Sequence, residues 1–207
     1  MPRSSFRVLY SDIGGVLGTN GWDTDIRLRI CDKFGVDTVE AERRHRLMFD
    51  SYERGFTTFE DYLNYVFFYT ERPFTLEAVR EFTYAQSVPW FENMDFVRRF
   101  RTANGLKLGL ISNEGAGITQ HRVVKFGLRE LADFMVISHF VHFRKPDPEI
   151  WKLALDLAGC TVEESIYIDD RPMFVQVARD LGFTSIHHIS LETTRRDLHD
   201  LGLQTES

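Results

Sequence analysis

The sequence predicts a doubly wound α/β fold, in which helices cover a parallel sheet and a block of helices is inserted after the first strand. A short apolar run, Phe6–Tyr10, leads into Ser11 and Asp12, as a buried strand would. Helical patterns alone then fill about 20–88. After Pro89, apolar strands and amphipathic helices alternate with short turns between them, which is the pattern of parallel β–α units.

The inserted block contains a series of helical patterns. The third pattern is expected to open at a capping box formed by Thr57 and Glu60. It also carries a dense aromatic cluster, which is interpreted as the core of the block. The expected helices are Asp23–Phe34, Thr38–Glu53, a segment through 61–69, and Thr75–Tyr84.

The remainder of the chain is expected to alternate between strand and helix. The expected strands, after the first at 7–13, are 106–112, 133–138, 165–170 and 184–189. The expected helices are Asp95–Asn104, Ile118–Phe126, 147–159, Met173–Leu181 and Thr193–Leu201. We therefore predict two domains: a core made of 1–17 and 89–207, and an inserted α-helical domain made of 18–88.

The composition is that of an ordinary soluble globular protein, since 43% of the 207 residues are hydrophobic and 27% are charged. A net charge of −6 gives no reason to expect binding to nucleic acid or to an anionic membrane. Cys31 and Cys160 are expected to be reduced thiols. We expect neither a signal segment nor a membrane span, which would need ~20 apolar residues, and hence a cytoplasmic location. The sequence says nothing of the oligomeric state.

Polar side chains collect where the predicted strands end. In an open α/β sheet, ligands bind at the carboxyl ends of the strands, so these side chains are expected to share one site. They comprise a hydroxyl, an amide, an ammonium and three carboxylates: Asp12, Ser112, Asn113, Lys145, Asp169 and Asp170.

Such a set supports phosphoryl transfer. A carboxylate such as Asp12 can attack phosphorus and form an acyl phosphate. Gly14 and Gly15 would let backbone N–H groups approach the phosphate oxygens. Ser112 can donate to a phosphate oxygen, and Lys145 supplies a point charge for the phosphate and for the crowded carboxylates. The aspartates together offer the hard oxygen ligands that Mg²⁺ binds along with a substrate phosphate.

Four motifs in order resemble those of the haloacid dehalogenase (HAD) superfamily, over approximately 6–203. They are DIGGVL at 12–17, LISNE at 110–114, RKPDPEIW at 144–151 and YIDDRPMFVQVARDLGF at 167–183. The third is very similar to that of the subfamily with an α-helical C1 cap inserted after the first motif. The resemblance implies a Rossmann-like core with a mobile helical cap. It also implies Mg²⁺-dependent hydrolysis of a small phosphorylated metabolite, such as a sugar phosphate, through an aspartyl-phosphate.

The resemblance implies a role for each matching position. Asp12 matches the nucleophile. Ser112 matches the phosphate-binding hydroxyl, with the backbone of Asn113 near it, and Gly15 belongs to the same substrate-binding loop. Lys145 matches the lysine that steadies nucleophile and phosphate.

The implied metal site consists of the side chains of Asp12, Asp170 and Asp169 and the backbone carbonyl of Gly14. One position departs from the family pattern here. Members often carry Asp or Asn four residues after Asp170, where this chain has Phe174, which cannot bind a metal. We expect the metal site to lean on Asp169 instead.

Gly14 is the second departure, because family phosphatases usually carry at this position an Asp that protonates the leaving oxygen. Such a general acid is typically worth ~10²–10⁴ in rate. A phosphatase with Gly14 would suit a leaving group that needs little protonation, such as a sugar 1-phosphate or an acyl phosphate, or would use water or a cap residue.

Two alternatives to the phosphatase remain open. A non-catalytic relative would bind a phosphorylated ligand or a partner. A 2-haloacid dehalogenase would need no acid, because halide leaves without a proton, but it would have no use for Asp169 and Asp170. We favour the phosphatase.

Other polar residues have plainer interpretations. Asp23 could supply the missing acid, but it fits a helix N-cap better. His139 and His142 have the spacing of a zinc pair without a third ligand nearby, and are interpreted as surface or loop histidines. His187 and His188 are expected to be structural.

Overall fold

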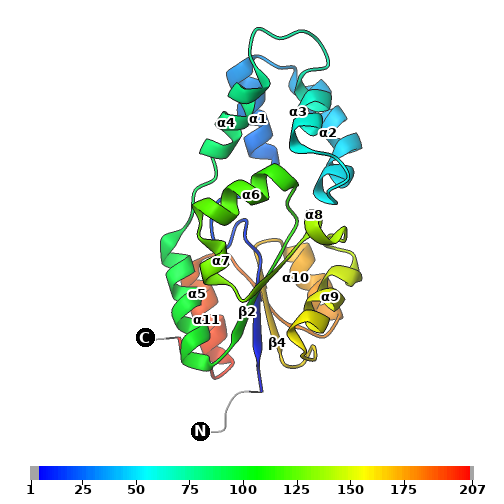
Figure 1. Ribbon diagram of the computed structural model, residues 1–207. Coiled ribbons are helices and arrows are strands. Elements are labelled where there is room, and N and C mark those ends of the chain that lie inside the picture. Colours follow the sequence, from blue (N-terminus) through cyan, green and yellow to red (C-terminus); the bar gives the residue numbers. More distant parts are fainter. Residues whose placement is uncertain (1–4, 206–207) are drawn as a thin grey trace.

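A five-stranded parallel sheet forms the lower half of the molecule (Figure 1). The computed structural model describes residues 5–205. The strands are β1 (Val8–Ser11), β2 (Lys107–Ser112), β3 (Phe134–Ile137), β4 (Ser165–Asp169) and β5 (Thr184–His187). Their spatial order is β3-β2-β1-β4-β5, and every pair is parallel. The predicted α/β class is confirmed.

The register of β1, the central strand, fixes the position of the site. Ser11 pairs with Leu110 of β2 on one side and with Ile168 of β4 on the other. Asp12 therefore leaves the sheet level with the last residues of both neighbours, and its N–H donates to the carbonyl of Ile168 at 2.9 Å. The carboxyl ends of three adjacent strands thus meet at the edge that faces the inserted helices (Figure 1).

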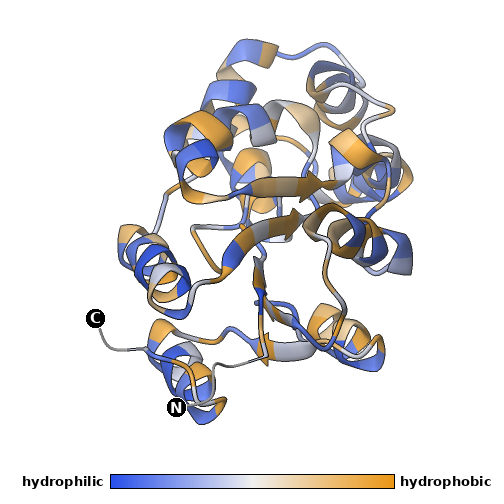
Figure 2. Cartoon of the chain, turned by 60° about the horizontal axis from the view of Figure 1, so that its bottom comes forward, coloured by the Kyte–Doolittle hydropathy of each residue, from blue (hydrophilic) through white to orange (hydrophobic). Residues whose placement is uncertain are grey.

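Helices cover both faces of the sheet. Phe96 and Leu198 contribute to an apolar cluster on one face, and Trp151 and Ala178 contribute to the cluster on the other. Figure 2 shows the strands in hydrophobic colours between helices of mixed hydropathy, as expected for strands buried on both faces. The core helices are α5 (Phe91–Asn104), α6 (Ala116–Lys125), α7 (Leu128–Leu131), α8 (Ser138–Val141), α9 (Pro148–Ala158), α10 (Pro172–Asp180) and α11 (Leu191–Asp200). Within residues 5–205, no helix has the length and apolar character needed to cross a membrane.

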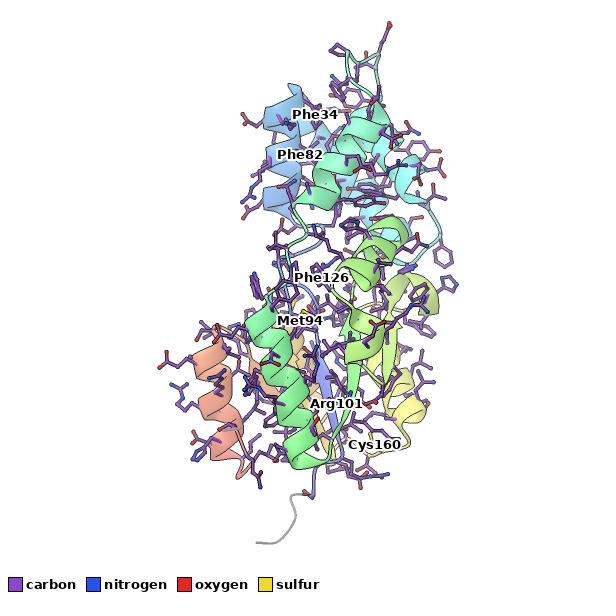
Figure 3. All side chains as sticks on the ribbon, turned by 60° about the vertical axis from the view of Figure 1, so that its left-hand side comes forward. Phe34, Phe82, Met94, Arg101, Phe126 and Cys160 are labelled. Atoms are coloured by element: carbon purple, nitrogen blue, oxygen red, sulfur yellow. The ribbon has the colours of Figure 1, made fainter. Side chains whose placement is uncertain are left out.

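The inserted helices pack around an aromatic core of their own. Tyr62 and Phe67 are fully buried, and the Trp22 ring meets the Tyr62 ring edge to face, with 5.3 Å between centroids. Phe34 and Phe82 form a similar edge-to-face pair at 5.8 Å (Figure 3). These helices, which we call the cap, are α1 (Thr24–Phe34), α2 (Thr38–Glu53), α3 (Phe59–Phe67) and α4 (Leu76–Ala85). The division of the chain into domains at residues 18 and 88 stays a prediction.

Several predicted helix starts were wrong, including that of α11, which begins at Leu191 rather than Thr193. Thr58, and not Thr57, caps α3, because its hydroxyl accepts from the N–H of Asp61 at 3.1 Å. Helix α5 starts at Phe91 rather than Asp95, and α6 starts at Ala116 rather than Ile118. Neither of these two helices has a side-chain cap, so the sequence carries no signal for its first turn. The short helices α7 and α8 were also not predicted.

The cap docks on the core through aromatic rings that lie against glycines of α6 and the residue before it. A Cβ added to Gly115 would lie 2.0 Å from the ring of Tyr52, and one added to Gly117 would lie 2.9 Å from Phe59 and Tyr84. Such distances leave no room for a side chain, so the rings rest directly on the backbone. In Figure 1, α6 lies between the cap and the sheet.

Polar contacts join the same two parts beside this interface. Arg54, at the end of α2, bonds to the carboxylate of Asp147 at 2.5 Å and to the carbonyl of His142 at 3.1 Å. Glu53 pairs with Arg144 of the core at 2.6 Å. The cap is therefore held by ring packing on one side and by ion pairs on the other.

The ring packing makes a test of cap docking. We expect Gly115→Ala to lower the free energy of unfolding by about 1–3 kcal/mol, because the methyl group and the Tyr52 ring cannot occupy the same space. Limited proteolysis should then cut the cap faster than in the wild type. The double variant Gly115→Ala with Tyr52→Leu should cost less than the sum of the single changes. Simple additivity in urea unfolding would show that the two groups do not meet.

Candidate functional site

A cavity of about 330 Å³ opens where the carboxyl edge of the sheet faces the cap. Its walls come from the core, from the loop that follows β1, and from α2 of the cap. Five of the predicted site residues line it: Asp12, Gly14, Ser112, Asn113 and Lys145. The other three predicted residues lie next to Asp12. The carboxylates of Asp169 and Asp170 approach that of Asp12, and Gly15 packs against Asp170.

The ammonium group of Lys145 is the centre of the site. Its Nζ lies 2.6 Å from Oδ2 of Asp169 and 3.3 Å from Oδ1 of Asp12. The side chain of Lys145 is fully buried. Burial lowers the pKa of Lys145, but Asp12 and Asp169 outweigh burial and raise the pKa above its usual range. Lys145 therefore stays charged and holds two carboxylates together.

Asp12 is nearly buried and has its Oδ1 fixed from two sides. Besides Lys145, the N–H of Ile13 donates to this oxygen at 2.8 Å. Burial raises the pKa of Asp12 to about 7; Lys145 opposes the rise and the charge of Asp169 adds to it. The site thus holds more carboxylate charge than one lysine neutralises.

Asp169 and Asp170 differ in how many of their carboxylate oxygens have hydrogen-bond partners. Asp169 accepts hydrogen bonds from Lys145, from the hydroxyl of Tyr167, and from the N–H of Arg171 at 2.8 Å. Within the described chain, Oδ1 of Asp170 is buried without a hydrogen-bond partner. Burial raises the pKa of Asp170, the charge of Asp169 adds to the rise, and Arg171 and Lys145 oppose it.

These carboxylates fit a divalent cation. Oxygens of Asp12, Asp169 and Asp170 lie within 4.8 Å of one another, and hard oxygen donors are the ligands that Mg²⁺ prefers. The unpartnered oxygen of Asp170 is the kind of group that such a cation would satisfy. Which of the aspartates ligate the metal stays a prediction.

Gly15 and Phe174 shape this carboxylate cluster without contributing to it. Gly15 has φ +67°, and a Cβ there would lie 2.2 Å from Oδ2 of Asp170. Its N–H donates to the carbonyl of Gly18 at 2.8 Å, so a substrate contact by Gly15 stays a prediction. Phe174, which stands where relatives often carry a metal ligand, places its ring 5.0 Å from Nζ of Lys145. It covers the buried ammonium instead.

Asn113 positions Lys145 through the backbone. Its Nδ2 donates to the carbonyl of Lys145 at 2.8 Å, and its Oδ1 accepts from the N–H of Lys145 at 2.8 Å. The peptide bond between Lys145 and Pro146 is cis. Both ends of the amide are thus engaged by the loop that carries Lys145, and the backbone of Asn113 keeps its predicted part in phosphate binding.

Asn20, which follows the first motif, lies beside Gly14. A Cβ added to Gly14 would be 2.7 Å from Oδ1 of Asn20 and 3.4 Å from its Cα. The space that a side chain at position 14 would enter is therefore occupied by Asn20, which also lines the cavity. The two residues are six positions apart, and no spacing rule connects them.

A buried ion pair between Glu114 and Arg122 was also missed. Nη1 of Arg122 lies 2.5 Å from Oε1 of Glu114, and Nη2 donates to the carbonyl of Thr19 at 2.8 Å. Arg122 is fully buried, and Glu114 is nearly so. Burial raises the pKa of Glu114, and Arg122 opposes the rise. The sequence signal that could have revealed this pair is the charged residue Glu114 directly after LISN, where the strand ends.

The structure confirms some of the predictions for Asp23 and the histidines and contradicts one of them. Asp23 is the N-cap of α1, since its Oδ1 accepts from the N–H of Ile26 at 2.9 Å. His139 is buried in α8 and not at the surface, whereas His142 is exposed. His188 is structural as predicted, with Nδ1 2.8 Å from the hydroxyl of Thr194. Among the described residues, only the aspartates form a group of three side chains placed to hold a metal.

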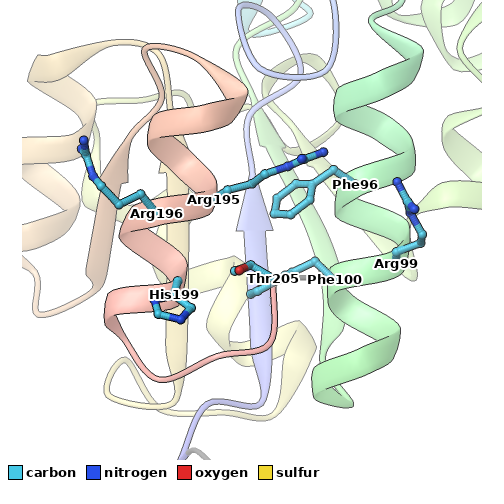
Figure 4. A pocket seen from close by; sticks show the side chains of 7 residues that line it. All are labelled: Phe96, Arg99, Phe100, Arg195, Arg196, His199 and Thr205. Atoms are coloured by element: carbon cyan, nitrogen blue, oxygen red, sulfur yellow. The ribbon is translucent and has the colours of Figure 1, made fainter. Parts of the chain in front are cut away.

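A second cavity, of about 440 Å³, lies between α5 and α11 on the flank of the sheet (Figure 4). It contains none of the predicted site residues. Arginines line it over Phe96 and Phe100, but Arg195 and Arg196 pair with nearby carboxylates at 3.9 and 3.0 Å. The predicted site residues are therefore concentrated at the carboxyl edge of the sheet.

Comparison with known proteins identifies the family of this chain. A family model described as "Haloacid dehalogenase-like hydrolase" matches residues 18–187. The chain belongs to this family of hydrolases. The predicted membership in the HAD superfamily is confirmed, while the subtype of its cap stays a prediction.

Curated relatives of this HAD-like hydrolase include three enzymes that each share part of its sequence. A bifunctional epoxide hydrolase 2 of Sus scrofa is 37% identical over 34% of this chain and 13% of its own length. The flavin mononucleotide hydrolase 1 of Arabidopsis thaliana is 24% identical over 82% of this chain and 69% of its own. A glyceraldehyde 3-phosphate phosphatase of Methanocaldococcus jannaschii is 30% identical over 47% of this chain and 42% of its own.

Solved structures resemble the fold of this HAD-like hydrolase at low sequence identity. A HAD family enzyme of Bacteroides thetaiotaomicron, in complex with magnesium and inorganic phosphate, has a TM-score of 0.72 at 22% identity and covers 88% of this chain and 93% of its own. A predicted HAD-like hydrolase of Porphyromonas gingivalis has a TM-score of 0.75 at 20% identity, with coverage of 94% and 98%. An L-2-haloacid dehalogenase has a TM-score of 0.65 at 21% identity, with coverage of 90% and 87%.

The Asn113 clamp makes a test of how Lys145 is positioned. We expect Asn113→Ala to cost about 1–3 kcal/mol of stability, because two backbone groups of Lys145 lose their partner. Asn104 offers a matched control, since its amide clamps the backbone of Gln204 in the same way on the far side of the core. Both changes should lower the melting temperature, but only Asn113→Ala should weaken the binding of inorganic phosphate. Equal phosphate affinity in both variants would contradict the positioning role.

The Glu114–Arg122 pair makes a second test. We expect Arg122→Met to cost about 3–5 kcal/mol, because it leaves a buried carboxylate without its counter-charge. The double variant Arg122→Met with Glu114→Gln should be more stable than Arg122→Met alone, because it removes that unpaired charge. Urea unfolding of the three proteins measures both effects. A double variant less stable than the single one would show that Glu114 does not depend on Arg122.

Proposed function

We propose that the protein is a Mg²⁺-dependent phosphatase that acts on a small phosphorylated metabolite. The observation that carries the proposal is the buried ammonium of Lys145 between Asp12 and Asp169, beside an unpartnered oxygen of Asp170. A fixed cation, a fixed carboxylate and a vacant carboxylate oxygen at one cavity are what attack on a phosphate ester requires.

Asp12 is the nucleophile in this proposal. Its Oδ1 is engaged by Lys145 and the N–H of Ile13, which leaves Oδ2 to attack phosphorus. The new bond forms as the bond from phosphorus to the leaving oxygen breaks, which gives an acyl phosphate on Asp12. A water molecule then attacks phosphorus, the bond to Asp12 breaks, and inorganic phosphate and the free carboxylate are regenerated.

The remaining residues bind and orient the substrate. The hydroxyl of Ser112 donates to a phosphoryl oxygen, and Lys145 offsets the charge of the phosphoryl group. Asp12, Asp170 and the carbonyl of Gly14 would hold Mg²⁺, with Asp169 steadying Lys145. The bound ion supplies charge neutralisation to a phosphate that several carboxylates would otherwise repel.

In this proposal the substrate is small and its leaving group departs readily. The cavity of about 330 Å³ is near the low end of the ~300–1,000 Å³ range of ligand sites, which favours a metabolite of sugar-phosphate size. Arg144 and Arg171 add positive charge to its wall. Because Gly14 offers no proton, a sugar 1-phosphate or an acyl phosphate suits the site best. The names of two relatives, a flavin mononucleotide hydrolase and a glyceraldehyde 3-phosphate phosphatase, support phosphate ester hydrolysis.

Dehalogenation of a 2-haloacid is a second candidate, and Gly14 is the observation that favours it. Halide needs no proton to leave, and an L-2-haloacid dehalogenase shares the fold. The unpartnered oxygen of Asp170 favours the phosphatase, because a metal ligand has no task in metal-independent dehalogenation.

A panel of small phosphates, assayed with and without Mg²⁺, tests the proposal. We expect Asp12→Asn to lower kcat by at least about 10³-fold on every substrate, because the amide cannot attack phosphorus. Removal of the metal by EDTA should abolish turnover, and added Mg²⁺ should restore it. Asp23→Asn is a matched control, because it removes a carboxylate from the same cavity and keeps an N-capping residue.

Each alternative gives a distinct outcome in the same panel. Full activity in Asp12→Asn would overturn the assignment of the nucleophile. Chloride release from a 2-haloacid in the presence of EDTA would establish the dehalogenase. Absence of turnover together with thermal stabilisation by a phosphorylated ligand would mean that the protein only binds its ligand.

A further inference from the structure

We propose that the side-chain amide of Asn20 contacts the leaving oxygen of the substrate and donates a hydrogen bond to it without donating a proton. The inference rests on the proposed phosphatase function and specifies its substrate class. Asn20 would make the enzyme selective for phosphates whose leaving groups depart as weak bases.

Asn20 occupies the position next to the nucleophile that a longer residue at Gly14 would fill. Its Oδ1 lies 2.7 Å from where a Cβ of residue 14 would be, and both residues line the cavity with Asp12. The side-chain amide of Asn20 carries two N–H donors, and the residue lines the cavity beside the nucleophile.

The loop that carries Asn20 is fixed at several points. It folds back on itself through a bridge between Gly14 and Gly18. The N–H of Thr19 donates to the carbonyl of Val88 at 2.9 Å, and the carbonyl of Thr19 accepts from Arg122 at 2.8 Å. The residue before Asn20 is therefore held through both its N–H and its carbonyl, which positions Asn20 at the cavity as preorganisation for a transition state requires.

The other polar side chains on the cap side of the cavity are engaged elsewhere. Nε1 of Trp22 donates to a tyrosine hydroxyl at 3.0 Å, and Asp23 caps α1. Oε2 of Glu53 accepts two hydrogen bonds from Arg144, at 2.6 and 2.8 Å. Burial raises the pKa of Glu53 above its usual range, and the Arg144 guanidinium opposes part of the rise. Both contacts hold the Glu53 carboxylate against Arg144. The amide of Asn20 is therefore the donor that we assign to the leaving group.

The chemical consequence is a steep dependence on the leaving group. When Asp12 attacks, the bond from phosphorus to the leaving oxygen breaks and its electron pair stays on that oxygen. An amide N–H stabilises the negative charge that develops there, but the proton that finally neutralises it comes from water. Phosphates of weakly basic leaving groups, including hemiacetal and acyl phosphates, should therefore turn over faster than those of ordinary alcohols.

The test is a series of aryl phosphates, from p-nitrophenyl phosphate to phenyl phosphate, assayed at saturating Mg²⁺. The wild type should show a steep fall in kcat as the leaving phenol becomes more basic. Asn20→Asp places a carboxyl group at the same position, and should raise kcat on phenyl phosphate relative to p-nitrophenyl phosphate by about 10–10²-fold. The gain should disappear at high pH, where the new carboxyl group is ionised. Asn20→Ala should lower kcat by up to about 10²-fold while retaining the steep dependence.

A swap of the two positions provides a sharper variant. Gly14→Asp alone must displace Asn20, because the new Cβ would collide with Oδ1 of Asn20. The double variant Gly14→Asp with Asn20→Gly vacates that space, and should flatten the dependence on the leaving group more than Gly14→Asp does. Glu53→Gln should keep the steep dependence of the wild type. A wild type that is already insensitive to the leaving group, and becomes sensitive in Glu53→Gln, would identify Glu53 as the acid and overturn the proposal.

Binding of inorganic phosphate separates a failure of this inference from a failure of the proposed function. Inorganic phosphate has no leaving group, so its stabilisation of the protein in the presence of Mg²⁺ should be the same in the wild type, Asn20→Ala and Asn20→Asp. Loss of that stabilisation in the Asn20 variants would mean that Asn20 shapes the phosphate site and not the leaving-group site. If the wild type hydrolyses no member of the series, the phosphatase itself is refuted. If it hydrolyses them and Asn20→Asp keeps the slope of the wild type, only the role of Asn20 is refuted.

Discussion

The buried ammonium group of Lys145 is the interaction on which the rest of the site depends. A charge with no solvent contact is costly unless it is paired and hydrogen bonded, and Lys145 meets two carboxylates within 3.3 Å. Its surroundings are built to keep it there. The Asn113 amide holds its backbone, and the Phe174 ring covers its head group.

The geometry of the sheet explains why Lys145 can hold two carboxylates together and yet does not neutralise all of the negative charge around it. β1 and β4 are neighbours in register, so their ends bring Asp12, Asp169 and Asp170 to one place. Lys145 neutralises part of this charge and fixes two of the three groups. Burial is the main cause of the raised pKa of Asp12, about 7, and the charge of Asp169 adds to it. Together with the unpartnered oxygen of Asp170, this crowding of carboxylates supports the proposed Mg²⁺ site.

The sequence was sufficient to predict what local patterns and strand ends determine. Alternation of strand and helix predicted the sheet, and polar residues at strand ends predicted Asp12, Ser112 and Lys145 as neighbours. The approach of Asn20 to Gly14 depends on a loop that folds back, and the pairing of Glu114 with Arg122 depends on the packing of α6. Such contacts produce no periodic pattern in the sequence from which they could be predicted. The starts of α5 and α6 escaped prediction because neither helix has a capping side chain to mark its first turn.

Arg122 links two sides of the cavity. One end of its guanidinium binds Glu114, which follows the end of β2, and the other binds the carbonyl of Thr19, which precedes Asn20. A single buried side chain thus joins the end of β2 to the loop that carries Asn20. The cap rests on the same helix through Gly115 and Gly117. In the proposed reaction, a movement of α6 would therefore affect the packing of the cap and the position of Asn20 together.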